Sequence, residues 1–361
     1  MHKNPFQILI LKDTYAIINP KELSIMLKKN RAVGFCTAIF IIFIFILSAC
    51  SKQNTETCDF FSMDTYCSIT VYSSLKSGGL QKICAQVSEQ AEKTITSLSG
   101  SQTVFAKQDG QQLQLSDDLA DILSLSADMY KKSNGKFDIT IAPLSELWDV
   151  KNATEPPPEE QISQLLPLVG SENFVLEDHI LTFKMQGMGI DFGAVGKGFE
   201  AKKLQEALQA AGYQNGVINL GGNITVFGNK NGGTFRIGIK SPDSSSILGS
   251  VDVTDTSVVT SGNYERYFEY QGKRYHHLID PDTGYPSDNG LASVTVICTD
   301  PVLADALSTA IFISGLEKGR QIFDSYYGSS GLTGTIIATE DKKIIVWGDQ
   351  AFTLADDNYI S

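Results

Sequence analysis

Residues 189–212 read GIDFGAVGKGFEAKKLQEALQAAG and place a short apolar strand, a glycine-rich turn and a helix in immediate succession. The helix is indicated by Ala201, Leu204 and Leu208, which recur every three or four residues, and by a glycine at its end. A turn before a helix N-terminus is a favourable place for a phosphate group, because the first backbone N–H groups of the helix are free to bind it. The alternative is a tight turn in which the glycines only relieve backbone strain.

Two familiar nucleotide motifs do not fit this turn. A P-loop places a glycine where Asp191 stands, and it follows its lysine with serine or threonine, whereas Gly198 follows Lys197 here. A kinase DFG segment needs an H-R-D loop upstream, and the sequence contains none. The turn therefore belongs to neither class.

The rest of the chain predicts an α+β fold with a mainly antiparallel sheet. The composition is that of a globular protein, with 42% hydrophobic and 19% charged residues. Besides the helix after the glycine turn, helical periodicity is expected over residues 80–98, 116–132 and 301–314, and strand patterns over 67–72, 173–183, 216–227, 235–239, 257–260, 275–279, 292–298, 334–339 and 343–347. Strands dominate the second half without regular alternation with helices, which favours one large domain or two closely packed lobes.

The first 49 residues have the pattern of an export signal. Basic residues between positions 28 and 31 precede an uncharged apolar run over 32–46. The run is shorter than the roughly 20 residues of a spanning helix, although a short uncleaved anchor is the alternative. Leu47-Ser48-Ala49-Cys50 resembles a bacterial lipobox, so we expect a lipid on Cys50 and an extracytoplasmic protein anchored to the cytoplasmic membrane.

Cleavage before Cys50 leaves an acidic chain. The net charge is −12, and removing the six basic and two acidic residues of positions 1–49 makes it −16. Such a charge repels nucleic acid and anionic lipid, and an anionic ligand would need a cation in its site. We expect translation to start at Met26, a tether over 50–59 and one domain over 60–361. Beyond residue 50 the cysteines are Cys58, Cys67, Cys84 and Cys298, and they form no C-x-x-C pair. The sequence does not decide whether these four residues form disulfides or are buried thiols.

The segment DPVLADALSTA, residues 300–310, places three oxygen-bearing side chains on one helix face. Asp305, Ser308 and Thr309 stand at i, i+3 and i+4 among apolar neighbours. An acid and two hydroxyls on an apolar helix are costly unless something binds them, and Mg²⁺ prefers few carboxylates, neutral oxygens and ligand phosphates. The alternative is a structural role, in which the hydroxyls bond to carbonyls of the preceding turn.

A pair of histidines precedes a rigid turn in RYHHLIDPDTGYP, residues 274–286. Neighbours on a strand point to opposite faces, so we expect one of His276 and His277 to face a site and the other to face core or solvent. A histidine in this position is a candidate general base.

Together with NGKFDITIAPLSELWDV (134–150), VINLGGNITVFG (217–228) and SMDTYCSITVY (62–72), these segments resemble the ApbE family of FAD:protein FMN transferases. The matching motifs, in chain order, are Met63-Asp64-Thr65, Gly135-Lys136-Phe137-Asp138, Asp191 to Gly198, Asn219 to Asn223, Thr260-Ser261-Gly262, His277 to Pro281 and Ala304 to Thr309. Seven short motifs in one order are specific, and the resemblance runs from about Phe61 to the C-terminus.

The resemblance implies an α+β enzyme that uses Mg²⁺ to transfer FMN from FAD to a threonine hydroxyl of an acceptor flavoprotein, with release of AMP. It implies FAD contacts from Met63, Lys136, Phe137, Asp138, Asp191, Lys197 and Ile279. It implies a metal site made by Asp305, Ser308, Thr309 and the Ala194 carbonyl, with His277 and Asp305 as catalytic residues.

One departure and two alternatives accompany the resemblance. Asp64 stands where the family usually has glycine. An FAD pyrophosphatase, with water as acceptor, would use the same metal site, and a flavin-binding lipoprotein without turnover is a non-enzymatic alternative. A solute-binding lipoprotein is disfavoured because the two-lobed βαβ pattern is absent from the sequence.

Overall fold

The computed structural model describes residues 9–11, 14–16, 54–73, 79–230, 232–243 and 246–360, which form two units divided between Gln53 and Asn54. In the first unit, β1 (Leu9–Leu11) pairs antiparallel with β2 (Thr14–Ala16). The predicted signal run and lipobox lie outside the described residues. No helix within the described ranges is both long and apolar enough to cross a membrane.

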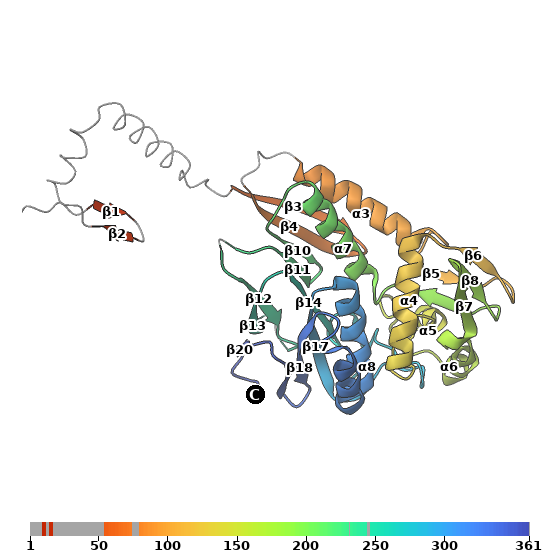
Figure 1. The fold of residues 1–361 in the computed structure, drawn as a ribbon. Coiled ribbons are helices and arrows are strands. Elements are labelled where there is room, and N and C mark those ends of the chain that lie inside the picture. Colours follow the sequence, from red (N-terminus) through yellow and green to blue (C-terminus); the bar gives the residue numbers. More distant parts are fainter. Residues whose placement is uncertain are drawn as a thin grey trace, which may run out of the picture. The chain divides into compact units, whose positions relative to one another are not determined.

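An eight-stranded sheet forms the centre of the second unit (Figure 1). Its strands, in spatial order, are β19 (Ile344–Gly348), β18 (Leu332–Thr339), β17 (Leu291–Cys298), β14 (Thr256–Gly262), β11 (Asn223–Phe227), β10 (Gly216–Leu220), β4 (Thr65–Ser73) and β3 (Asn54–Ser62). Every neighbouring pair is antiparallel. The predicted α+β class with a mainly antiparallel sheet is confirmed.

Three helices cover one face of this sheet: α3 (Leu80–Thr96), α7 (Gly196–Ala210) and α8 (Pro301–Tyr326). The start of α7 lies directly against the start of α8, because a Cβ on Gly198 would stand only 2.3 Å from the Pro301 carbonyl oxygen. Only glycine allows this approach, and it brings the glycine turn of residues 191–198 next to Asp305. Helix α8 has a kink at Gly315, whose φ of 71° is outside the helical region.

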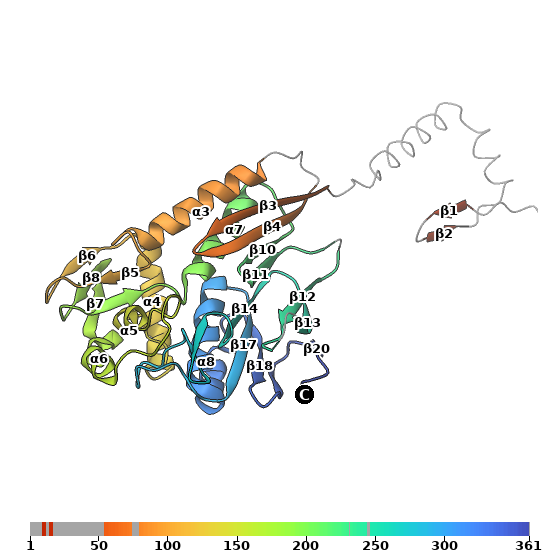
Figure 2. The same ribbon diagram turned by 180° about the vertical axis from the view of Figure 1, so that it is seen from behind.

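The other face of the large sheet packs against a three-stranded sheet, β12 (Phe235–Lys240), β13 (Ile247–Val253) and β20 (Phe352–Leu354) (Figure 2). The alternation of buried and exposed residues in β12 puts Phe235, Ile237 and Ile239 on the shared interface. Because both faces are covered at the centre of the large sheet, all eight residues of β17 are buried, whereas the edge strands β3 and β19 keep exposed residues.

A peripheral group of elements completes the second unit. Its helices are α4 (Asp117–Lys132), α5 (Ala142–Trp148) and α6 (Glu159–Leu165), with 3₁₀ turns over Leu166–Leu168 and Ser171–Asn173; its strands are β5 (Thr103–Phe105), β6 (Gln112–Gln114), β7 (Phe174–Glu177), β8 (Ile180–Phe183) and β9 (Gly189–Asp191). Ser116 is the N-cap of α4, since it accepts a hydrogen bond from the Leu119 N–H. A separate hairpin, β15 (Tyr267–Tyr270) with β16 (Lys273–His276), precedes the predicted histidine turn.

Some boundaries differ from the predictions. The polar tether expected to reach residue 59 is shorter, because β3 begins at Asn54 and hydrogen-bonds along β4. The apolar segment after Gly135 continues into α5, which has Pro143 in its first turn. The strand expected over 173–183 is a hairpin whose turn residues, Asp178 and His179, both have positive φ.

Candidate active site

A cavity of about 510 Å³ lies where α7, α8, the β3–β4 turn, α5 and the segment after β16 meet. Seven of the residues predicted for the site line it: Asp191, Ala194, Lys197, His277, Ile279, Asp305 and Thr309. These residues come from three regions of the sequence that are far apart. The fold therefore brings together the glycine turn, the histidine segment and the helix with the oxygen-bearing face.

The glycine turn positions Asp191 and Lys197 by backbone contacts. The Asp191 N–H donates to the Ile139 carbonyl at 2.8 Å, and its Oδ1 accepts from the Gly193 N–H at 2.8 Å. Burial raises the pKa of Asp191 above its usual range. Lys197 lies in the first turn of α7, so an ammonium group and a helix N-terminus face the same cavity. Both favour a phosphate there.

Asp305 is the most enclosed carboxylate of the cavity, with 3% of its surface exposed. Its Oδ2 accepts from the Gly198 N–H at 2.9 Å, its Oδ1 accepts from the Asn223 amide at 2.8 Å, and Lys197 Nζ lies 3.8 Å from Oδ1. Burial raises the pKa of Asp305, while the Lys197 charge and these two hydrogen bonds lower it. The carboxylate is held in one orientation, which is a requirement for a metal ligand.

The neutral oxygens beside Asp305 fit a hard cation. The Gly198 N–H donates to Asp305 and not to the Ala194 carbonyl one turn earlier. No hydrogen bond between described residues has the Ala194 carbonyl as its acceptor. Thr309 also lines the cavity. The described residues contain no cluster of three or more His, Cys, Asp or Glu suited to a metal, so a metal here would depend on one carboxylate, neutral oxygens and ligand phosphates, as Mg²⁺ prefers.

Ser308 differs from this group. Its side chain is fully buried and is not part of the cavity wall. Its Oγ donates to the Asp305 carbonyl at 2.9 Å and lies 2.8 Å from Ser261 Oγ, which in turn lies 3.2 Å from Thr309 Oγ1. The structure therefore places Ser308 behind the wall, where it supports Ser261 and Thr309.

The two histidines lie on opposite sides of one segment, as the strand alternation predicts. His277 lines the 510 Å³ cavity, and its Nδ1 lies 3.3 Å from the Arg266 carbonyl oxygen. A carbonyl only accepts hydrogen bonds, so Nδ1 carries the hydrogen and Nε2 keeps a free lone pair. Burial, followed by the charge of Arg266, lowers the pKa of His277 to about 3, which keeps the imidazole neutral.

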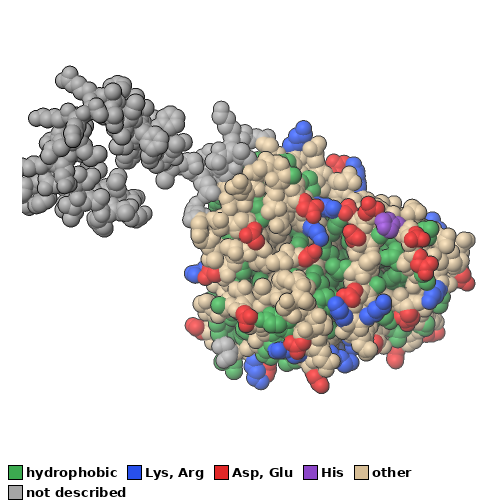
Figure 3. Space-filling view, viewed as in Figure 1, with side chains coloured by type: hydrophobic (Ala, Val, Ile, Leu, Met, Phe, Trp, Pro, Cys, Tyr) green, Lys and Arg blue, Asp and Glu red, His purple; other side chains and the backbone are tan. Residues whose placement is uncertain are grey.

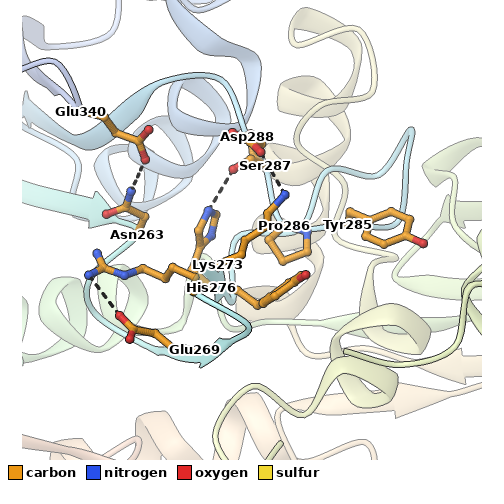
Figure 4. Close-up of a pocket in the computed structure, with 12 residues that line it drawn as sticks. Asn263, Glu269, Lys273, His276, Tyr285, Pro286, Ser287, Asp288 and Glu340 are labelled. Carbon is orange, nitrogen blue, oxygen red and sulfur yellow. Dashed lines mark hydrogen bonds and ion pairs between the residues drawn. The ribbon is translucent and has the colours of Figure 1, made fainter. Parts of the chain in front are cut away.

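His276 faces a second cavity, of about 500 Å³ (Figure 4). Its Nε2 donates to the Ser287 carbonyl at 2.9 Å and its Nδ1 accepts from the Leu278 N–H at 3.2 Å. Its ring also meets Phe312 edge-on, with centroids 5.6 Å apart. Burial lowers the pKa of His276 to about 4. Both nitrogens are occupied, so His276 is a structural histidine.

The β3–β4 turn contains the departure from the family motif. Met63 and Asp64 have φ of 45° and 60°, the left-handed region that glycine and asparagine occupy most easily. Met63 is buried against Gly196, since a Cβ there would stand 3.3 Å from its sulfur. Asp64 lines the cavity and pairs with Lys151 at 3.1 Å. The acid thus changes the charge at the cavity edge while the turn keeps a glycine-like backbone.

The segment from Lys136 to Asp138 lies behind the cavity wall, although the resemblance implies contact with FAD. The Lys136 ammonium is bound to Asp280 and Asp282. Asp138 accepts hydrogen bonds from Thr140 and Ser171. Burial, opposed by these bonds, raises the pKa of Asp138. The side chains of this segment therefore brace the wall from behind.

Several cavity residues had not been predicted. Ser145 and Lys151 belong to or follow α5, and Glu265 and Arg266 precede β15. Arg266 supplies a positive charge close enough to affect both Asp191 and His277. No sequence pattern singles out these loop positions. On the face shown in Figure 3, acidic and basic side chains are interspersed, without a large patch of one charge.

The four cysteines that follow residue 50 are buried free thiols, which answers the open disulfide question for this structure.

Comparison with known proteins places this site in a family. A curated relative from Klebsiella pneumoniae, named FAD:protein FMN transferase, is 39% identical over 188 residues, 51% of this chain and 58% of that protein. A relative of the same name from Vibrio cholerae is 32% identical over 199 residues, 54% of this chain and 60% of that protein. The chain thus matches less than two thirds of the length of these two relatives.

Solved structures share the fold over a longer stretch. The ApbE protein of Thermotoga maritima superposes with a TM-score of 0.72 at 25% identity, covering 84% of this chain and 97% of that one. The ApbE family model matches residues 63–331, which include all the predicted catalytic, metal-binding and FAD-binding residues. The chain belongs to the ApbE family.

Proposed function

We propose that this chain transfers FMN from FAD to a hydroxyl group of an acceptor protein and releases AMP. The observation that carries the proposal is the convergence of Lys197, His277 and Asp305 on one cavity. The names of the curated relatives support the same reaction. We propose threonine as the acceptor residue and Mg²⁺ as the metal, as the resemblance implies.

The residues divide the work as follows. Lys197 and the N-terminus of α7 bind the pyrophosphate of FAD, and Asp191 and Ile279 hold the rest of the dinucleotide against the wall. Met63, buried against Gly196, supports the start of α7. Asp305, Thr309 and the Ala194 carbonyl would hold Mg²⁺, with Ser308 supporting Thr309 through Ser261. When bound, the ion neutralises phosphate charge and stabilises the leaving AMP.

His277 supplies the proton transfer. Its Nε2 takes the proton of the acceptor hydroxyl while that oxygen attacks the phosphorus of the FMN half. The bond from this phosphorus to the bridging oxygen breaks, and AMP leaves with that oxygen. The low pKa of His277 belongs to the protein without FAD; a bound anionic pyrophosphate raises it toward neutrality, which improves the base.

The test is incubation of the purified chain with FAD, MgCl₂ and a threonine-containing acceptor, followed by intact mass of the acceptor and quantification of AMP. Transfer predicts one FMN per acceptor and an equal amount of AMP, both abolished by a chelator. AMP and free FMN without a modified acceptor would indicate a pyrophosphatase. FAD binding without AMP would indicate a flavin-binding protein.

We also propose that the chain is an extracytoplasmic lipoprotein that starts at Met26 and is lipidated on Cys50. The basic flank, the short apolar run and the lipobox-like sequence support this localisation. Mass spectrometry of the membrane-extracted protein tests this proposal and should show a lipidated N-terminal Cys50. A soluble chain that retains residues 32–49 would contradict the proposal.

A further inference from the structure

The Lys136 side chain lies between two carboxylates of the turn that follows the histidine segment. Its Nζ is 2.7 Å from both oxygens of Asp280 and 2.8 Å from Asp282 Oδ2. The Lys136 and Asp280 side chains are 11% and 16% exposed, whereas Asp282 is 60% exposed. The ion pair between Lys136 and Asp280 is therefore almost completely shielded from solvent, and an ion pair in such surroundings holds its two side chains in a defined geometry.

The turn is a compact unit directly continuous with the cavity wall. The Asp280 N–H donates to the Tyr285 carbonyl and the Gly284 N–H donates to the Asp280 carbonyl, both at 2.8 Å. The Trp148 indole N–H donates to the Gly284 carbonyl at 2.7 Å. Residues 277, 278 and 279, which immediately precede the turn, all line the cavity. A shift of the turn would therefore be transmitted to the histidine.

The histidine segment is not part of the large sheet, and apart from Lys136 it is held by Ser287, whose N–H donates to the Leu278 carbonyl at 2.9 Å, and by the packing of Leu278 and Ile279. Hairpin β15–β16 forms its own two-stranded sheet, and after it the chain does not join the large sheet until β17 begins at Leu291. His277 itself is tied to the hairpin by its N–H, which donates to the Arg266 carbonyl at 3.2 Å. Lys136 supplies a contact of a different kind, because it joins this segment to the chain that leaves α4.

We propose that Lys136 is a positioning residue for His277, acting through Asp280. The ammonium fixes the turn of residues 280–286 and thereby the distance of the His277 imidazole from the substrate. Misplacement of a reacting group by about 1 Å can cost on the order of 10²-fold in rate. The activity part of this inference rests on the proposed transferase function; the structural part does not.

The first variant is Lys136→Met, which keeps an unbranched side chain one atom shorter and removes the charge. We expect at least a tenfold loss in FMN transfer at saturating FAD, with the KM for FAD changed by less than about threefold, because Lys136 does not line the cavity. Lys136→Arg keeps the charge and should retain most of the activity. Lys132→Met is the matched control, since Lys132 forms a 2.9 Å ion pair with Asp128 at the end of α4 but is remote from the turn.

A double variant separates positioning from stability. Lys136→Met alone leaves the Asp280 carboxylate nearly buried and unpaired, which destabilises the fold; Lys136→Met with Asp280→Asn removes that charge and should recover much of the lost thermal stability. FMN transfer should remain low in the double variant, because the ion pair between residues 136 and 280 is still missing. Recovery of both stability and transfer would overturn the inference.

Hydrogen exchange provides a readout that does not depend on catalysis. We expect faster exchange at the amides of residues 280, 284 and 287 in Lys136→Met and in the double variant, and no change in Lys132→Met. Wild-type exchange at these amides in Lys136→Met would contradict the positioning role. Absence of transfer by the wild-type protein would contradict the proposed function, while the exchange result would still decide the role of Lys136.

Discussion

The adjacent histidines allow a sharp test of the candidate active site. Replacing His277 by Ala removes the imidazole whose free Nε2 faces the cavity, while replacing His276 by Ala removes a buried ring that serves the fold. The two substitutions are chemically identical and one residue apart. They should nevertheless damage different properties of the protein.

The expected magnitudes come from the contacts of each ring. A general base contributes about 10² to 10⁴ in rate, so His277→Ala should slow transfer by at least 100-fold, which is about 3 to 5 kcal/mol of barrier. His276→Ala leaves the Ser287 carbonyl and the Leu278 N–H without their partner and removes the edge contact with Phe312. It should cost about 2 to 4 kcal/mol of unfolding free energy.

The assay is single-turnover FMN attachment at saturating FAD and Mg²⁺, with urea unfolding measured on the same preparations. His277→Ala should lose transfer and keep both stability and FAD binding, whereas His276→Ala should lose stability and keep transfer and FAD binding under conditions where it is folded. Equal losses of transfer in the two folded variants would refute the assignment of His277 as the base. A loss of transfer only in His276→Ala would mean that the sides of the segment are reversed.

Four further outcomes are expected. Asp305→Asn keeps an acceptor for the Gly198 N–H but weakens metal binding, so FAD cleavage should fall at least 100-fold and lose its response to Mg²⁺; wild-type turnover would rule out the metal site. Gly198→Ala should lower the melting temperature and weaken FAD binding, because its Cβ would meet the Pro301 carbonyl at 2.3 Å; unchanged melting would mean that the helices can separate freely. Burial lowers the pKa of His276 from 6.5 to about 4, so as the pH falls the unfolded chain binds a proton on this histidine before the folded chain does. The folded state is therefore favoured fully above pH 6.5 and loses unfolding free energy as the pH falls toward 4. Between pH 7 and 5 the wild type should lose about 2 kcal/mol more unfolding free energy than His276→Gln. Cys50→Ala should release the protein from membranes, and membrane retention would contradict lipidation.

The sequence predicted those parts of the fold and site that depend on local pattern. Asp305 and Thr309 share a helix face because they are four residues apart, and the strand alternation separated His277 from His276. Ser308, three residues from Asp305, lies behind the wall, where its Oγ is 2.8 Å from Ser261 Oγ. Spacing alone could not distinguish these two hydroxyls.

Long-range contacts set the limit of prediction elsewhere. Lys136 and Asp280 are 144 positions apart, and no local pattern pairs them. Arg266 enters the cavity from a loop between strands of different sheets, where periodicity gives no signal. The order of the eight strands, with β4 beside β10 and β14 beside β17, also depends on pairing between distant segments.

The charges around the cavity explain why a cation belongs in the proposed reaction. The lining includes five carboxylates and three basic side chains: Asp64, Asp149, Asp191, Glu265 and Asp305, against Lys151, Lys197 and Arg266. Lys151 is already paired with Asp64, and Lys197 lies 3.8 Å from Asp305. The basic groups therefore compensate the protein's own acids before any phosphate enters. Because a pyrophosphate brings further negative charge into a partly buried space, we propose that a divalent cation enters with FAD when its phosphates bind beside Asp305. The Ala194 carbonyl, left free because Gly198 bonds to Asp305, is an additional oxygen for that cation. The same hydrogen bond that docks α7 on α8 thus also prepares the proposed metal site.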